Sequence, residues 1–299
     1  MSQTNGFDGL KIIGDRINPG FKSTKALMDA NDMEGIQALA VKQVEAGAEY
    51  LDITVGRRAK EDPKFLIDVI KAVQEVVAVP LCMDEPEVPL QRVMLEAYDQ
   101  DKAGGQLPLV NSVVEPRYAM MQLYKEVRPF KVILLTSERV EDGVNKTNRS
   151  ADEVISTAKR VTRRMQDEYG VPLNDIFIDV QVVAVCSDSY GQHRAAHAAV
   201  QAIHTDPEMQ GVHMMGGLTN VGQMLPPKAV DGSDLKLCLE NVFLTRVVPH
   251  GFDYVLATPW RQFSPIPADH YVSQVYDEFL QATGTDALRK ARKFYKAGL

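Results

Sequence analysis

Short apolar runs alternate along the chain with longer segments whose apolar residues recur at helical spacing. We interpret eight of the short runs as strands. Strands of a parallel sheet are buried on both faces, so they read as nearly continuous apolar sequence, and the helices that cover them are amphipathic. The predicted strands are LKIIGDRIN (10–18), YLDITVG (50–56), PLCMDE (80–85), LPLVNSV (107–113), FKVILLTS (130–137), IFIDVQVV (176–183), VHMMGGLTN (212–220) and YVLATP (254–259).

The segments between these runs carry helix signals. Ser150, three residues before Glu153, is typical of a capping box, and Gly170 stands where a glycine commonly ends a helix. Together with the apolar spacing, these signals predict helices that include 32–48, 63–77, 150–170 and 268–284.

The order of these elements favours one barrel over two domains. No linker, low-complexity tract or shift in composition divides the chain. Eight βα units in one domain most naturally close into a TIM barrel. We therefore predict an α/β protein in which residues 1–299 form a single (β/α)8 barrel, with an open, doubly wound sheet as the structural alternative.

Composition and charge limit the partners. The formal charge of −7 and the isoelectric point near 5.5 give no broad attraction to nucleic acid or to an anionic membrane. Cys82, Cys186 and Cys238 lack C-x-x-C spacing, which argues against a disulfide framework or a zinc knuckle. The N-terminal MSQTNGFDG lacks a signal-peptide pattern, and the apolar runs are too short to span a bilayer. We expect a soluble, cytoplasmic protein.

Polar side chains recur at the ends of the predicted strands. In a βα barrel the active site lies where strands lead into helices. Each residue alone is more typical of a helix cap or a turn, but recurrence after six of eight strands indicates a shared polar cavity. The set is Asp15, Asn18, Asp52, Asp84, Asn111, Asp179 and Asn220.

This mixture of carboxylates and carboxamides suits a flat heterocycle that carries amino and lactam groups. Carboxylates accept from its N–H groups, and Asn both donates and accepts. A metal site is the competing use of the Asp residues. It is disfavoured, because the set mixes Asp with Asn and no His cluster is nearby.

Several segments resemble the pterin-binding family of TIM barrels, which includes the dihydropteroate synthases, and within it the methyltetrahydrofolate:corrinoid protein methyltransferases. IIGDRIN is similar to that group's IGERIN, GAEYLDITVG to GA-x-x-LDxNVG, and LCMDE to CLDS. LVNS, FIDVQV and GGLTNVGQ are similar to INS, YIDP and GLSNVS.

The resemblance implies an enzyme that moves a methyl group between N5 of tetrahydrofolate and the cobalt of a corrinoid (cobalamin), in either direction. Asp84, Asn111 and Asp179 would hold the pterin ring. Asn220 would act near N5 without titrating, and Asp84 or Asp179 would relay the proton. The remaining implied wall residues are Asn18, Asp52, Gly217 and Gln223, with Gly216 and Gly217 allowing close backbone approach.

The chain departs from the family pattern at three motif positions. Asp15 stands where Glu is usual, Thr54 where Asn is usual and Gly222 where Ser is usual. The segment SERVEDGVNKTNRS (137–150) is longer than expected, and it is either a partner-contacting loop or a solvated insertion.

Other features bear on partners and rivals. A corrinoid-binding D-x-H-x-x-G motif is absent, so the corrinoid is expected on a separate protein. His193 and His197 lack a third ligand, and we interpret them as solvated helix residues. Dihydropteroate synthase is the nearest rival, but its Ser-x-Lys segment is missing and Lys228 is poorly placed to replace it. A non-catalytic folate or pterin carrier is a second rival, and the resemblance implies a homodimer.

Overall fold

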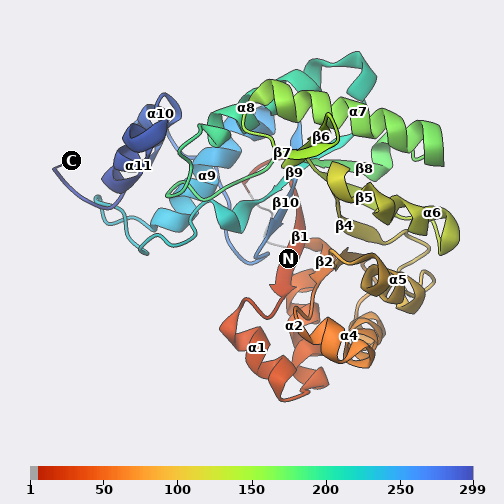
Figure 1. Ribbon diagram of the computed structural model, residues 1–299. Coiled ribbons are helices and arrows are strands. Elements are labelled where there is room, and N and C mark those ends of the chain that lie inside the picture. The colour runs from red at the N-terminus through yellow and green to blue at the C-terminus, as the bar shows by residue number, and fades with distance from the viewer. Residues whose placement is uncertain (1–5, 299) are drawn as a thin grey trace.

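The computed structural model describes residues 6–298 and contains a closed barrel of parallel strands. Around the barrel the strands follow the order β1-β10-β9-β8-β5-β4-β3-β2 (Figure 1). Their bounds are β1 (Lys11–Ile17), β2 (Ala48–Ile53), β3 (Leu81–Asp84), β4 (Leu109–Val113), β5 (Lys131–Leu135), β8 (Ile176–Asp179), β9 (His213–Gly217) and β10 (Phe252–Ala257). All eight predicted strands therefore lie in a TIM barrel, and the open-sheet alternative is wrong. That residues 1–299 form one domain stays a prediction.

Helices cover the outside of this barrel (Figure 1). The α-helices are α1 (Lys22–Asp29), α2 (Met33–Glu45), α3 (Arg58–Glu61), α4 (Pro63–Val76), α5 (Val88–Ala97), α6 (Leu123–Glu126), α7 (Ala151–Tyr169), α8 (Gln192–Thr205), α9 (Leu235–Val247), α10 (Tyr271–Leu280) and α11 (Gly284–Lys293). Short 3-10 turns are η1 (Glu115–Gln122), η2 (Leu173–Asp175), η3 (Pro207–Met209), η4 (Leu218–Asn220) and η5 (Val248–His250).

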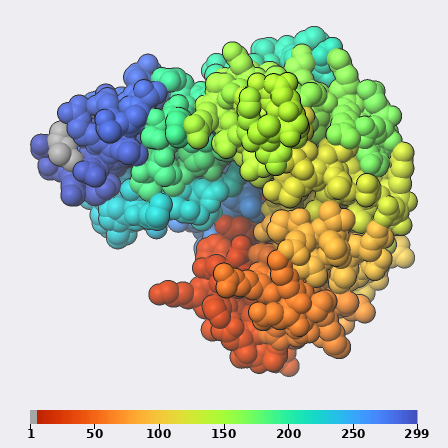
Figure 2. Space-filling model, in the orientation of Figure 1, coloured from red at the N-terminus to blue at the C-terminus, as the bar shows by residue number. Residues whose placement is uncertain are grey.

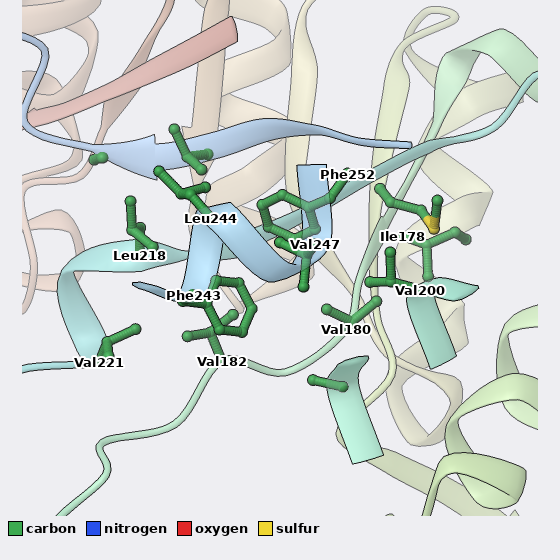
Figure 3. Close-up of a cluster of buried hydrophobic side chains, with 14 of the residues drawn as sticks. Ile178, Val180, Val182, Val200, Leu218, Val221, Phe243, Leu244, Val247 and Phe252 are labelled. Atoms are coloured by element: carbon green, nitrogen blue, oxygen red, sulfur yellow. The ribbon is translucent and has the colours of Figure 1, made fainter. Parts of the chain in front are cut away.

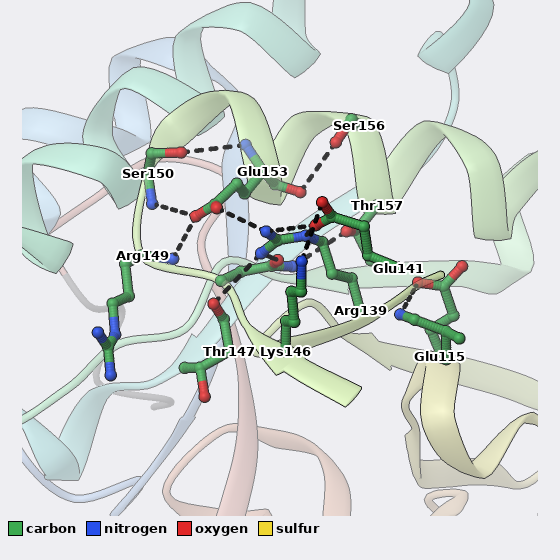
Figure 4. A network of polar contacts seen from close by, with 12 residues as sticks. Glu115, Arg139, Glu141, Lys146, Thr147, Arg149, Ser150, Glu153, Ser156 and Thr157 are labelled. Carbon is green, nitrogen blue, oxygen red and sulfur yellow. Dashed lines mark hydrogen bonds and ion pairs between the residues drawn. The ribbon is translucent and has the colours of Figure 1, made fainter. Parts of the chain in front are cut away.

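The predicted helix signals at α7 are confirmed. Ser150 Oγ accepts from the backbone N–H of Glu153 at 3.3 Å, and the Glu153 carboxylate accepts from the Ser150 N–H at 3.0 Å (Figure 4). At the other end Gly170 has φ 69°, a left-handed conformation that glycine adopts without strain. The helix predicted at 268–284 is divided, because α10 ends at Leu280 and α11 begins at Gly284. Figure 2 shows these two helices projecting from one side of the barrel.

The main apolar core lies between the barrel and its helices. Figure 3 shows part of it, where Phe243, Leu244 and Val247 of α9 meet Val182 and Phe252. These side chains are buried to more than nine-tenths, so the helix is held by the removal of its apolar face from water.

His193 is buried and His197 partly buried against Phe243 of this core, and their interpretation as solvated residues is wrong. Both rings contact Tyr276 Oη, at 2.8 Å from His193 Nδ1 and 3.1 Å from His197 Nε2. His193 Nε2 lies 2.8 Å from the carbonyl oxygen of Val183. Burial lowers the pKa of both imidazoles, which keeps them neutral inside the helix layer.

The long segment after β5 forms a hairpin of β6 (Glu138–Glu141) and β7 (Val144–Thr147). Arg139 anchors it through ion pairs to Glu141 at 2.7 Å and to Glu153 at 2.9 Å (Figure 4). The backbone N–H of Val140 donates to Glu115, whose carboxylate also binds Arg160 at 2.7 Å. The segment is thus an ordered extension attached to α7 and η1.

Within residues 6–298, no helix combines the length and the apolar character needed to cross a bilayer. Residues 1–5 of the stretch compared with a signal peptide lie outside the described part of the chain.

Candidate functional site

The interior of the barrel is built in layers by the alternation of side chains along each strand. Successive residues of a strand point to opposite faces, so residues two apart share a face. The central layer is apolar and contains one residue from every strand: Ile13, Tyr50, Cys82, Leu109, Ile133, Phe177, Met215 and Tyr254. Two residues further along each strand stand Asp15, Asp52, Asp84, Asn111, Leu135, Asp179, Gly217 and Leu256. This second layer, called the polar layer below, lies at the carboxyl ends of the strands and contains five of the seven predicted polar residues: Asp15, Asp52, Asp84, Asn111 and Asp179.

A cavity of about 360 Å³ opens above this layer. Its wall contains six of the site residues that the family resemblance implies: Asn18, Asp52, Asp84, Gly217, Asn220 and Gln223. It also contains Asp15, from the set of polar residues at strand ends. Gly20, Phe21, Thr219 and Leu256 were not predicted, although Thr219 adjoins Asn220 in the segment that was recognised. The full wall is Asp15, Asn18, Gly20, Phe21, Asp52, Asp84, Gly217, Thr219, Asn220, Gln223 and Leu256.

Asn111 and Asp179 belong to the same layer but lie outside that wall. Asn111 is linked to the cavity through Asp52, because its Nδ2 donates to Asp52 Oδ1 at 3.2 Å. Asp179 accepts from the backbone N–H of Gln181 at 2.8 Å. Asn18 lines the cavity while its Oδ1 accepts from Gly20 N–H at 2.8 Å, which shapes the loop after β1.

The carboxylates of the layer hold their protons unusually strongly. Asp52 is 1% exposed, and its Oδ2 is buried without a partner among the described residues. Burial raises the pKa of Asp52 well above its usual range, and the charge of Asp84 raises it further. Burial, with the charge of Glu85, raises the pKa of Asp84 to about 6. Burial also raises the pKa of Asp179 to about 6, against the lowering effect of the Gln181 hydrogen bond.

Asp15 connects the first strand to the last two. Its Oδ2 accepts from Thr219 Oγ at 2.8 Å and its Oδ1 from Thr258 Oγ at 3.0 Å. Burial raises the pKa of Asp15, and these two hydrogen bonds oppose the rise. The carboxylate therefore fixes the turn that begins directly after β9.

That turn, η4, presents Asn220 to the cavity. Gln223 Nε2 donates to Asn220 Oδ1 at 2.7 Å, and Asn220 Nδ2 makes only a long contact of 3.5 Å to the carbonyl of Val182. Gly217 leaves room for this amide, since a Cβ there would lie 2.8 Å from Asn220 Nδ2. The Asn220 side chain therefore does not cap its own turn.

Gly216 has a different role from the one expected. A Cβ on Gly216 would point away from the cavity and lie 2.3 Å from Val182 Cγ2. Its neighbour Gly217 faces the cavity, and the alternation of the strand puts Gly216 on the outer side. The prediction that Gly216 lets the backbone approach a ligand closely is therefore wrong.

Trp260 packs beside the site and is not part of the cavity wall. Its ring faces the Arg16 guanidinium at 5.5 Å and Lys42 Nζ at 4.2 Å. Arg16 lies 3.7 Å from the ring of Phe21, so two aromatic rings hold this guanidinium beside the cavity. Across residues 6–298 there is no group of three or more His, Cys, Asp or Glu side chains arranged to hold a metal ion.

The fold and the site together define a TIM barrel with an acid- and amide-lined mouth. A model described as pterin binding enzyme matches residues 16–257, and the chain belongs to this family.

Two curated relatives are distant. The methylcorrinoid:tetrahydrofolate methyltransferase of Eubacterium limosum is 24% identical over 83% of this chain and 84% of that protein. The methionine synthase of Mycobacterium leprae is 25% identical over 95% of this chain, which spans only 23% of that longer protein.

Solved structures of dihydropteroate synthases share the fold. The enzyme from Burkholderia cenocepacia has a TM-score of 0.54 at 16% identity and covers 98% of this chain and 97% of its own. The Xanthomonas albilineans enzyme with 4-aminobenzoic acid has the same TM-score at 14% identity, covering 85% and 89%.

Proposed function

We propose that this protein is a methyltransferase that moves a methyl group between N5 of tetrahydrofolate and the cobalt of a corrinoid carried by a separate protein. The observation that carries the proposal is the amide of Asn220, held by Gln223 at the edge of an acid-lined cavity. The relation to a methylcorrinoid:tetrahydrofolate methyltransferase supports it.

The polar layer matches the hydrogen-bonding edge of a pterin. The ring carries an amino group and N–H groups, which donate to carboxylates. We assign Asp84 and Asp179 to these donors; Asp84 lines the cavity, and Asp179 lies in the same layer outside its wall. Asn111 holds Asp52 in place from the neighbouring strand. Leu256 supplies an apolar surface in the same wall.

Asn220 would act where charge develops during the transfer. When cobalt(I) attacks the methyl carbon, the carbon–nitrogen bond breaks, its electron pair stays on N5, and N5 takes up a proton. An amide N–H can stabilise that electron pair, but it cannot supply the proton. With pKa values of about 6, Asp84 and Asp179 can pass a proton from solvent to this region near neutral pH. In the reverse direction the N5 electron pair attacks methylcobalt(III), and the same groups remove the proton.

The cavity is poorly suited to the rival synthase reaction. A pterin pyrophosphate needs cations, and the described residues of this wall include no Lys or Arg; the nearby Arg16 guanidinium is held against the rings of Phe21 and Trp260. Lys228, the candidate replacement, makes a backbone bridge with Asp234 away from the wall.

The cobalt chromophore provides the test. The protein is mixed with cob(I)alamin and 5-methyltetrahydrofolate, and separately with methylcobalamin and tetrahydrofolate, and the visible spectrum is followed. We expect protein-dependent interconversion of cob(I)alamin and methylcobalamin. Folate binding without any spectral change in either mixture would leave the chain a carrier and overturn the proposal.

A further inference from the structure

A second cavity, of about 540 Å³, adjoins the candidate site. The two cavities share Gly20 in the loop between β1 and α1. The second one lies between α1 and the segment that follows β2, from Val55 to Asp62. We propose that it receives the glutamate end of a folate substrate and that Arg57 binds the carboxylate. This inference rests on the proposed function, because it requires a folate in the first cavity.

The charges of the two cavities direct the tail. The first cavity is lined by Asp15, Asp52 and Asp84 and by no cation among its described residues. Such a wall offers no cation to the carboxylates of a glutamate tail, which are better placed beside a positive charge. Lys25, Arg57 and Arg58 line the second cavity together with Asp29, Glu61 and Asp62, so what attracts an anion there is a cation whose side chain is not already paired.

Arg57 is the cation that remains available. Lys25 is held by Asp29 at 2.6 Å. Arg58 donates to the carbonyl of Met28 at 2.6 Å and also contacts Asp62 at 3.4 Å. Arg57 is exposed, and its guanidinium has no ion pair or hydrogen bond within residues 6–298, although its backbone carbonyl accepts from the Lys60 N–H at 3.2 Å. Its guanidinium can therefore bind a carboxylate through two parallel N–H donors.

An aromatic side chain stands close to the path between the cavities. Phe21 lines the first cavity next to Gly20, and the Arg16 guanidinium supports its ring at 3.7 Å. The p-aminobenzoyl ring of a folate connects the pterin to the glutamate, and an aromatic surface suits that ring. The first cavity thus supplies acids and an aromatic ring for the pterin and p-aminobenzoyl groups, and the second, which shares Gly20 with it, supplies Arg57 for the glutamate.

Glu61 provides an opposing charge in the same cavity. It lies four residues after Arg57, and its carboxylate has no ion-pair or hydrogen-bond partner in the described part of the chain. Its carboxylate weakens the attraction of the cavity for an anionic tail. Removing the charge of Arg57 should therefore weaken tail binding, and removing the charge of Glu61 should strengthen it.

Dissociation constants for three ligands test the proposal: 5-methyltetrahydrofolate with one glutamate, the same folate with three glutamates, and 6-methyltetrahydropterin, which has no tail. We expect Arg57→Gln to weaken both folates roughly two- to fivefold, more for the triglutamate, as for a solvent-exposed ion pair. Glu61→Gln should strengthen the triglutamate. Neither change should alter binding of the tail-less pterin. Arg289→Gln, which removes an exposed charge on α11, is the matched control.

The outcomes separate this inference from the proposed function. Arg57→Gln that binds both folates like the unchanged protein overturns the tail assignment, as does an equal loss for the tail-less pterin. In both cases the pterin site itself stands. If the unchanged protein binds no pterin of any kind, the proposed function fails and the tail assignment fails with it.

Discussion

Gln223 holds the amide of Asn220 in one orientation at the mouth of the barrel. Its Nε2 donates to Asn220 Oδ1 at 2.7 Å, so the oxygen of the amide is occupied and the nitrogen is left beside the cavity. The two residues are one turn apart, just after β9. Under the proposed function, Nδ2, whose other contact is the 3.5 Å one to the carbonyl of Val182, is the donor that Asn220 would offer to the ligand.

Replacing Asn220 should therefore affect the reaction more than binding. We expect Asn220→Ala to slow methyl transfer by about 10²–10³-fold, as for the loss of one donor that stabilises developing charge. Folate affinity should fall less than about tenfold. Stopped-flow spectra of cobalt and a folate binding titration measure the two. Asn174→Ala, in the turn before β8 at the opposite end of the barrel, is the control. Equal losses in rate and affinity would contradict the role at N5.

Changing Gln223 tests the orientation of the amide. Gln223→Glu keeps the size of the side chain but removes the donor to Asn220 Oδ1. We expect its methyl-transfer rate to fall at least as far as that of Gln223→Ala, roughly tenfold, since a carboxylate favours the flipped amide. Single-turnover rates at saturating folate measure this effect. A Glu variant as fast as the unchanged protein would show that only the volume of Gln223 matters.

The adjacent glycines should respond differently to an added methyl group. In Gly217→Ala the new Cβ meets the movable end of Asn220 at 2.8 Å, so we expect slower transfer with little loss of stability. In Gly216→Ala it meets Val182 at 2.3 Å inside the packed core, and we expect a loss of about 1–3 kcal/mol in unfolding free energy. Urea denaturation and transfer rates distinguish the two. Equal destabilisation by both variants would refute the conclusion that a Cβ at Gly216 points into the core and one at Gly217 points toward Asn220.

Asp179 makes stability depend on pH. Its pKa rises from an ordinary 3.8 to about 6 in the folded chain. The folded state thus binds more protons than the unfolded state between about pH 4 and 6, and the unfolding free energy falls as pH rises through that window. Asp179→Asn should therefore gain on the order of 1–3 kcal/mol relative to the unchanged protein at pH 7, and the gain should vanish below about pH 4.

Asp206 is the control of opposite sign for this experiment. Its hydrogen bond with Lys159 holds the pKa of the carboxyl below its usual range, so its contribution is present at neutral pH and is lost as pH falls below about 4. Asp206→Asn should destabilise the ligand-free protein at pH 7, with an effect that shrinks in acid. Urea denaturation from pH 3 to 8 measures both variants. A pH-independent difference for Asp179→Asn would contradict its raised pKa.

The strands and the polar layer could be predicted from the sequence because both depend on local rules. A buried parallel strand needs continuous apolar residues, and the period of two places Asp52 on the same side as Tyr50 and Asp84 on the same side as Cys82. Strand ends in a barrel meet at one rim, so seven polar residues far apart in the sequence were expected to meet there. Five of these seven do line one cavity: Asp15, Asn18, Asp52, Asp84 and Asn220.

Only the tertiary structure decided which partner each of these side chains has. The sequence shows Gly216 and Gly217 as equivalent neighbours, yet packing directs one toward Val182 and the other toward Asn220. It shows His193 and His197 as polar helix residues, but both rings contact the hydroxyl of Tyr276, about 80 positions away. It shows Asp15 where the family usually has the longer Glu, while the folded chain brings the hydroxyls of Thr219 and Thr258 to the Asp15 carboxylate. Periodicity and strand order follow from local chain geometry. Burial, pKa and hydrogen-bond partners depend on residues that come together only when the barrel closes.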